Sequence, residues 1–153
     1  MLEQPVRFVS LLCTGLASGI ALCVFLAERI GTDDGRFYTQ LMQMLNRALT
    51  VPATVLGALG LVTMMVDAAL LYSRRGGGAL WLTAIAVALG LVALGLTKFG
   101  HFPINDKVLG WDPTSPPADW RAVQSRWSAL HIGRTICATV SFALVVVSNL
   151  SRG

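Results

Sequence analysis

Charged side chains are scarce in this sequence. Asp, Glu, Lys and Arg make up 13% of the residues and hydrophobic types 54%, whereas an ordinary soluble domain has ~25% charged residues. A chain with so little charge is expected to have the lipid bilayer as its main partner. The net charge of +4 comes from arginines scattered over connecting segments, so the sequence offers no basic patch for nucleic acid.

Cysteine is also rare, and its pattern argues against two kinds of site. Cys13, Cys23 and Cys137 are odd in number and have no CxxC spacing, which disfavours a disulfide framework or a cysteine-based metal cluster. The sequence also lacks the Gly-Lys-Ser/Thr run of phosphate-binding loops and the nucleophile elbow of hydrolases. We therefore predict neither a metal ion nor a cofactor.

The sequence contains instead four long apolar segments. A helix needs ~20 apolar residues to cross ~30 Å of hydrocarbon, and the first segment is too long and too weakly basic at its start for a signal peptide, so we expect it to be retained. The chain is predicted to be all-α: a single integral membrane domain over residues 1–153, forming a four-helix bundle with both termini on one side. The expected spans cover residues of about 7–28, 50–72, 79–99 and 131–150.

The connections between these spans differ in kind. The adjacent Gly76, Gly77 and Gly78 predict a tight hairpin between the second and third spans. Apolar residues at helical spacing over about 34–48 predict a short helix lying at the membrane interface. A pre-span helix over about 118–131 should lead into the last span. Before it, an extended lid segment is predicted from the prolines Pro103, Pro113, Pro116 and Pro117.

Basic residues give a divided signal for orientation. Arg74 and Arg75 crowd the short hairpin, and short loops determine orientation best. On this ground we expect cytoplasmic termini in a bacterial inner membrane. A larger number of basic residues lies on the opposite side, spread over longer segments, and favours the reverse orientation.

Titratable side chains gather at one end of the predicted bundle. The first span ends at Glu28, the third at Lys98 and His101, and the fourth begins with His131 and Arg134. Alternating span directions bring all three ends to the same membrane level. Because an unpaired charge in the membrane costs ~2.5–3.5 kcal/mol on insertion scales, we expect Glu28 to pair with Arg134 or Lys98.

The last helix presents aromatic and polar side chains on one face. At 100° per residue, the face spans about 80°. Such a face is typical either of a site or of an interfacial anchor, in which Trp and Arg lie at the headgroup level. Its members are Trp120, Gln124, Trp127, His131 and Arg134.

Gly15 and Gly19 form a GxxxG motif on the first span. Such a motif allows close approach of a helix from the same chain or from a second copy. A homo-oligomer formed through Gly15 and Gly19 is therefore one open alternative.

Residues 105–134 resemble the anthrone-oxygenase-like family of small four-helix membrane proteins. The resemblance depends on Asn105 and on an Arg-Trp-x3-His-x2-Arg motif made by Arg126, Trp127, His131 and Arg134. It implies a four-helix membrane fold and the oxidation of a polycyclic anthrone to an anthraquinone by molecular oxygen, without an obvious cofactor.

The roles that the resemblance suggests suit the chemistry of these residues. His131 would remove a benzylic proton, Arg134 and Asn105 would stabilise the enolate oxygen, and Glu28 would hold the imidazole or Arg134 in place. A hydrophobic aromatic or quinone-like substrate would arrive from the bilayer and lie against flat apolar side chains. Its binding residues would be Trp127, Asn105, Trp120, Gln124, Lys98 and His101.

Two other functions remain open from the sequence. His101 and His131 could bind a haem or a metal ion together with Glu28, which an optical spectrum of the purified protein would reveal. A non-catalytic accessory subunit would instead co-purify with a partner protein and without a small molecule.

Overall fold

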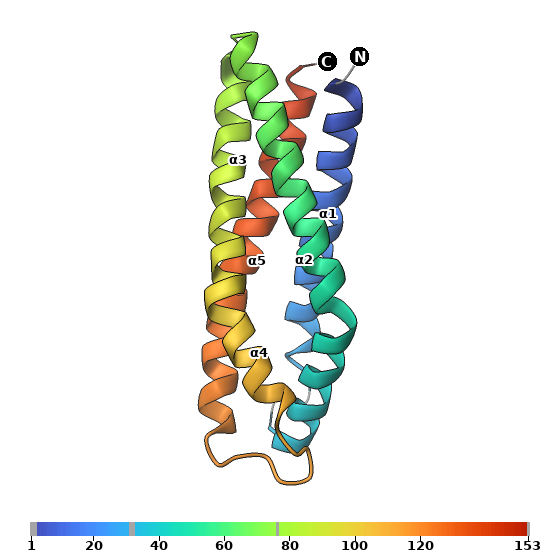
Figure 1. Cartoon of the computed structure of the whole chain (residues 1–153). Coiled ribbons are helices and arrows are strands. Elements are labelled where there is room, and N and C mark those ends of the chain that lie inside the picture. The colour runs from blue at the N-terminus through green and yellow to red at the C-terminus, as the bar shows by residue number, and fades with distance from the viewer. Residues whose placement is uncertain (1–2, 31–32, 76, 153) are drawn as a thin grey trace.

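The computed structural model describes residues 3–30, 33–75 and 77–152, and this part of the chain contains helices and no strands. Three of the helical elements, α3, η1 and α4, follow one another without a break, so the molecule consists of four long rods packed side by side (Figure 1). The elements are α1 (Glu3–Ala27), α2 (Gly35–Ser73), α3 (Gly77–Gly95), η1 (Leu96–His101), α4 (Phe102–Leu109) and α5 (Trp120–Leu150).

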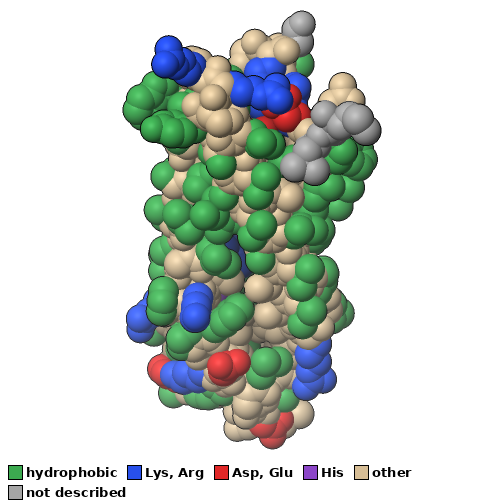
Figure 2. Space-filling model, turned by 45° about the horizontal axis from the view of Figure 1, so that its top comes forward, with side chains coloured by type: hydrophobic (Ala, Val, Ile, Leu, Met, Phe, Trp, Pro, Cys, Tyr) green, Lys and Arg blue, Asp and Glu red, His purple; other side chains and the backbone are tan. Residues whose placement is uncertain are grey.

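All four rods are long and apolar enough to cross a membrane, which confirms the all-helical membrane bundle. Figure 2 shows hydrophobic side chains over the middle of one face and charged side chains gathered toward its two ends, the distribution that a bilayer requires. Both termini lie at the end of the bundle that carries the turn between α2 and α3 (Figure 1). Gly76 of the predicted hairpin lies outside the described residues.

Helix α2 differs from the expected separate interfacial helix at about 34–48. That segment is the first part of one continuous 39-residue helix, which at 1.5 Å per residue is about 58 Å long and extends well beyond ~30 Å of hydrocarbon. The reason lies in its packing, because Tyr38 and Met42 are buried against Val24, Val108 and Trp127. The helix is thus held along the bundle axis rather than flat on the membrane.

The third rod also departs from the sequence prediction, because the helix continues past Pro103. The chain widens into the π-helical segment η1, where the Phe102 N–H bonds to Thr97 O, five residues back. Pro103 then occupies the first turn of α4, a position where its missing N–H is tolerated. The predicted extended segment is therefore confined to residues 110–119, between α4 and α5.

The rods make several close contacts with one another. A Cβ at Gly60 of α2 would come within 2.9 Å of Thr14 Cγ2 in α1, so this crossing requires glycine. On α1, a Cβ at Gly15 would meet the Phe142 ring of α5 at 3.1 Å, whereas a Cβ at Gly19 would meet nothing within 4 Å. Near the termini, Arg152 makes a double hydrogen bond with buried Asp67 at 2.9 and 2.7 Å.

Candidate functional site

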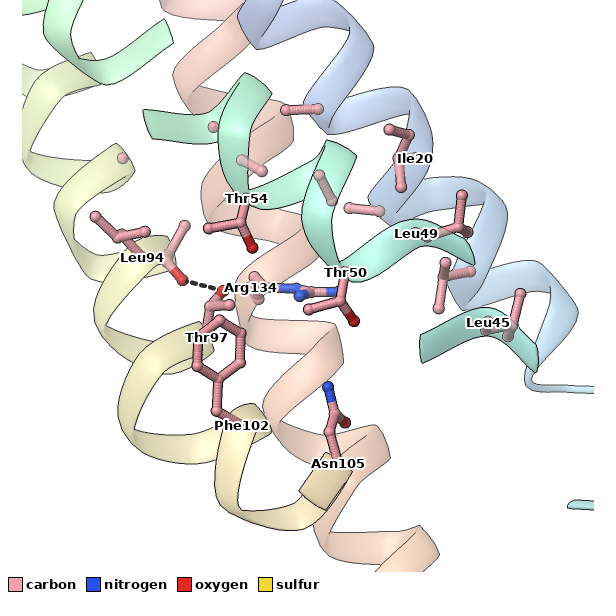
Figure 3. A pocket seen from close by; sticks show the side chains of 18 of the residues that line it. Ile20, Leu45, Leu49, Thr50, Thr54, Leu94, Thr97, Phe102, Asn105 and Arg134 are labelled. Carbon is pink, nitrogen blue, oxygen red and sulfur yellow. Dashed lines mark hydrogen bonds between the residues drawn. The ribbon is translucent and has the colours of Figure 1, made fainter. Parts of the chain in front are cut away.

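A cavity of about 140 Å³ lies between the rods. Its walls are mostly apolar and come from α1, α2, α5 and the third rod. In Figure 3, Arg134 of α5 extends toward Thr50 of α2, and Asn105 of α4 lies below both of them in this view. The blue of a Lys or Arg side chain is visible at the bottom of an opening in the apolar belt of Figure 2.

Three of the predicted site residues line this cavity: Arg134, Trp127 and Asn105. The two histidines do not contribute to its lining. His131 and His101 are nevertheless completely buried, at 0% and 1% exposure, and their rings contact Trp127. They therefore form a layer behind the cavity wall.

His131 has both ring nitrogens occupied. The Arg134 guanidinium donates to Nδ1 at 2.7 Å, and Nε2 lies 3.0 Å from the carbonyl oxygen of Ala21. A guanidinium can only donate and a carbonyl can only accept, so Nδ1 bears the lone pair and Nε2 bears the proton. His131 is thus a neutral ring that connects Arg134 to the backbone of α1.

His101 has the opposite tautomer. Its Nδ1 lies 3.0 Å from Leu96 O and must donate the proton. Its Nε2 is buried without a hydrogen-bond partner in the described part of the chain. The lone pair of Nε2 is therefore free, in contrast to both nitrogens of His131.

Trp127 connects the two histidines to the cavity. Its ring stacks on His131, with centroids 4.6 Å apart and planes at 22°, and meets the edge of His101 at 5.2 Å. The indole N–H donates to Asn105 Oδ1 at 2.8 Å. Because that oxygen is occupied, the amide NH₂ of Asn105 is left to donate elsewhere.

The predicted ion pair between Glu28 and Arg134 or Lys98 is not formed within 4.0 Å among the described residues. The Glu28 carboxylate is buried just beyond the end of α1, where it accepts a hydrogen bond from Ser128 at 3.3 Å. Lys98 is exposed beside Phe99. Within the part of the chain that is described, no carboxylate pairs with Arg134, and its Nε is buried without a partner.

Trp120 and Gln124, on the first turns of α5, do not line the cavity. The rings of Trp120 and Tyr38 pack together with their centroids 5.8 Å apart, and the Arg121 guanidinium lies over the Trp120 ring. Beside it, Lys107 of α4 donates to Asp119, the residue before α5, at 2.9 Å and lowers the pKa of that carboxyl group. Trp120 therefore helps to close the end of the bundle.

The described residues contain no group of three or more His, Cys, Asp and Glu side chains placed to hold a metal ion. His101 and His131 lie close together, with ring centroids 5.8 Å apart. However, the proton on His131 Nε2 and the bond from Arg134 to Nδ1 occupy both possible ligand atoms of that ring.

Asn46 is a site residue that the sequence interpretation missed. It lies on α2, lines the cavity and is only 9% exposed, and its Nδ2 has no partner among the described residues. A signal was present, because Asn46, Thr50 and Thr54 recur every four residues and so share one helix face. The predicted boundaries separate these residues, because Asn46 falls in the interfacial helix at about 34–48 and the two threonines fall in the span at about 50–72.

The family model described as anthrone oxygenase matches residues 41–144, which begin within α2, include α3, η1 and α4, and end within α5. No curated protein and no solved structure matches the chain.

Proposed function

The chain belongs to the anthrone oxygenase family, and we propose that it is a membrane-embedded oxygenase acting on a lipid-soluble aromatic ketone of the anthrone type. The observation that supports this proposal most strongly is Arg134, a guanidinium that faces a mostly apolar cavity without a carboxylate partner in the described chain. A buried cation in such a place is well suited to an oxygen that gains negative charge during a reaction.

The proposed reaction is balanced with molecular oxygen as the only co-reactant. Removal of a proton from the benzylic CH₂ leaves an enolate, and oxygen adds to that carbon to give a hydroperoxide. Loss of water from the hydroperoxide forms the second carbonyl, so CH₂ and O₂ become C=O and H₂O. Arg134 and the free NH₂ of Asn105 would stabilise the enolate oxygen, and Trp127 would provide a flat wall for the rings.

We assign the role of base to His131 through a change of partner. In the ligand-free protein, Arg134 occupies His131 Nδ1 at 2.7 Å. His131 Nδ1 lies behind the cavity wall and is covered by Arg134. A substrate oxygen in the cavity would draw the guanidinium away from the ring, which would open Nδ1 to the cavity and allow it to accept the benzylic proton. The imidazolium would give this proton to the peroxide anion and form the hydroperoxide. The neutral ring would then remove the second proton from the same carbon and pass it to the departing hydroxide, which leaves as water. In this proposal Glu28 acts from outside the cavity lining and helps to hold the end of α1 against α5 through Ser128.

Turnover in nanodiscs would test this function. The purified protein would be supplied with anthrone and ¹⁸O₂, and the label in anthraquinone would be followed by mass spectrometry against empty nanodiscs. We expect Arg134→Gln to lower kcat/KM by ~10²–10³, the usual effect of removing an oxyanion donor. Arg126→Gln, at an exposed arginine on the same helix, is the matched control and should retain activity. Full turnover by Arg134→Gln would refute the proposal.

We also propose that the protein lies in the bacterial inner membrane with cytoplasmic termini. The short turn between α2 and α3, which carries Arg74 and Arg75, supports this orientation.

A further inference from the structure

We infer that the outer face of α2 is the interface of a homodimer, in which the α2 helices of two copies pack side by side as a parallel coiled coil. The inference does not depend on the proposed function, and it concerns the face of α2 that points away from the cavity. An apolar stripe runs along this face. It begins with Phe37, Leu41, Met44, Ala48, Val51 and Val55 and continues with the same spacing to Tyr72.

The spacing of the apolar stripe is that of a coiled coil. From Phe37 to Tyr72 its members recur alternately four and three residues apart. This is the seven-residue repeat with which two helices supercoil around each other. Every position of the repeat holds an aliphatic or aromatic side chain or Met, and none of these residues is buried by the described part of the chain. The face is therefore continuous, apolar and without a partner inside the bundle.

Lipid accounts for the apolar stripe only in the second half of α2. The 39-residue helix is much longer than ~30 Å of hydrocarbon requires. Its first turns also carry Arg36, Gln40 and Arg47, and they lie at the end of the bundle that holds the loop between α4 and α5 (Figure 1). This part of the helix is therefore outside the hydrocarbon, yet Phe37 and Met44 are 40% and 60% exposed there.

Helix α5 has a different surface at the same end of the bundle. Its first turns expose Arg121, Ser125 and Arg126, as is usual for a helix in water. An apolar patch that is exposed to water and bordered by polar residues marks an interaction surface. In α2 the exposed side chains of Gln40 and Arg47 provide such a border beside the stripe.

A second copy of the chain is the partner that fits this surface. Seven large side chains of the stripe are between 40% and 76% exposed; at on the order of 100 Å² each, they offer about 700 Å² per copy, close to the ~800 Å² per partner of a standard interface. Two copies inserted in the same direction are related by a two-fold axis along the membrane normal, so their α2 helices run parallel. Each stripe then meets its own counterpart, and no charged residue of the stripe has to be buried.

The first turns of α2 should provide most of the stability of this dimer. Within the hydrocarbon, lipid tails are as apolar as the stripe, so that covering it with a second helix gains little. In water, burial of apolar surface gains about 25 cal/mol per Å². Met44 is the most exposed large side chain of the first turns and is therefore the position to test.

Disulfide cross-linking tests the geometry of the interface. In a cysteine-free background, Met44→Cys should form a disulfide between two copies in proteoliposomes on mild oxidation, because equivalent stripe positions face each other in a parallel coiled coil. Ser125→Cys, exposed on α5 at the same end of the bundle, is the matched control and should remain a single chain on a non-reducing gel. No cross-link for Met44→Cys, or equal cross-linking of both variants, would overturn the inference.

Energy transfer between donor-labelled and acceptor-labelled copies measures the strength of association. With dyes attached at Ser115→Cys in the same background, transfer in proteoliposomes should persist as the excess of lipid is raised. Met44→Lys should raise the dissociation constant of the dimer at least ~100-fold, because two unpaired charges would lie in an apolar contact. Ser125→Lys adds the same charge away from the stripe and should leave the dissociation constant unchanged.

Two results of this measurement would overturn the inference. One is a dimer that Met44→Lys does not weaken, since the contact would then lie elsewhere. The other is a wild type that is monomeric, with a spin label at Met44→Cys in contact with lipid headgroups, since the membrane surface would then cover the stripe. Met44 is largely exposed, so Met44→Lys should keep the helical circular dichroism of wild type; should it fail to fold, Met44→Gln allows the same comparison.

Discussion

Replacing His131 by Phe should destabilise the bundle by breaking the connection between α5 and α1. The substitution removes the hydrogen bond from charged Arg134 at 2.7 Å and the bond to Ala21 O at 3.0 Å. Hydrogen bonds to charged groups contribute about 1.5–3 kcal/mol and neutral ones about 0.5–1.5 kcal/mol. A phenyl ring retains the stacking on Trp127, so we expect a net loss of about 2–4 kcal/mol in the free energy of unfolding.

A double-mutant cycle would isolate the contact with Arg134. Unfolding would be followed by circular dichroism in mixed micelles of increasing SDS content, for His131→Phe, Arg134→Met and the double variant. The two residues should show a coupling energy of about 1.5–3 kcal/mol, because either single change already breaks their bond. The control is Ile136→Phe, since Ile136 is 58% exposed on the lipid-facing side of the same helix; its stability should change by less than about 0.5 kcal/mol. Additive losses, or a His131→Phe variant as stable as wild type, would refute the geometry described for His131.

Two further predictions concern the buried pair near the termini and the orientation of the chain in the membrane. Asp67→Asn breaks the buried pair with Arg152 and should lower the free energy of unfolding by about 3–5 kcal/mol in the same assay. Glu3→Gln, at a largely exposed pair with Arg74, should lower it by less than about 1 kcal/mol. Similar losses for both variants would contradict the burial of the pair between Asp67 and Arg152. In a cysteine-free background, Ser73→Cys should react with an impermeant maleimide only from the cytoplasmic side and Ser115→Cys only from the other side, and the opposite labelling pattern would reverse the proposed orientation.

The spans and the polar face of the last helix could be predicted from the sequence because both depend on local periodicity. Long apolar segments specify membrane helices without knowledge of their neighbours, and the spacing of Trp127, His131 and Arg134 places them on one face of any helix. Asn105 was identified through the family resemblance, and its bond to Trp127 agrees with a place in the same site.

The remaining features could not be predicted from the local sequence pattern. The helix continues past Pro103 because η1 is π-helical, with bonds such as that from Phe102 N–H to Thr97 O, five residues back. Whether a histidine nitrogen is free depends on which carbonyl lies beside it, and Ala21 is 110 residues away from His131 in the chain. The expected pairing of Glu28 with Arg134 was wrong because Ser128 takes the carboxylate while the guanidinium turns to His131 and the cavity.

The most direct test of the account is an experimental structure of the protein in nanodiscs with bound anthraquinone, the product of the proposed reaction. We predict density for the three rings inside the cavity against Trp127, with one carbonyl oxygen about 3 Å from the guanidinium of Arg134. Density for the quinone only on the outer, lipid-facing surface of the helices, with the Arg134 guanidinium still bonded to His131, would contradict the claim that this cavity is the site of reaction.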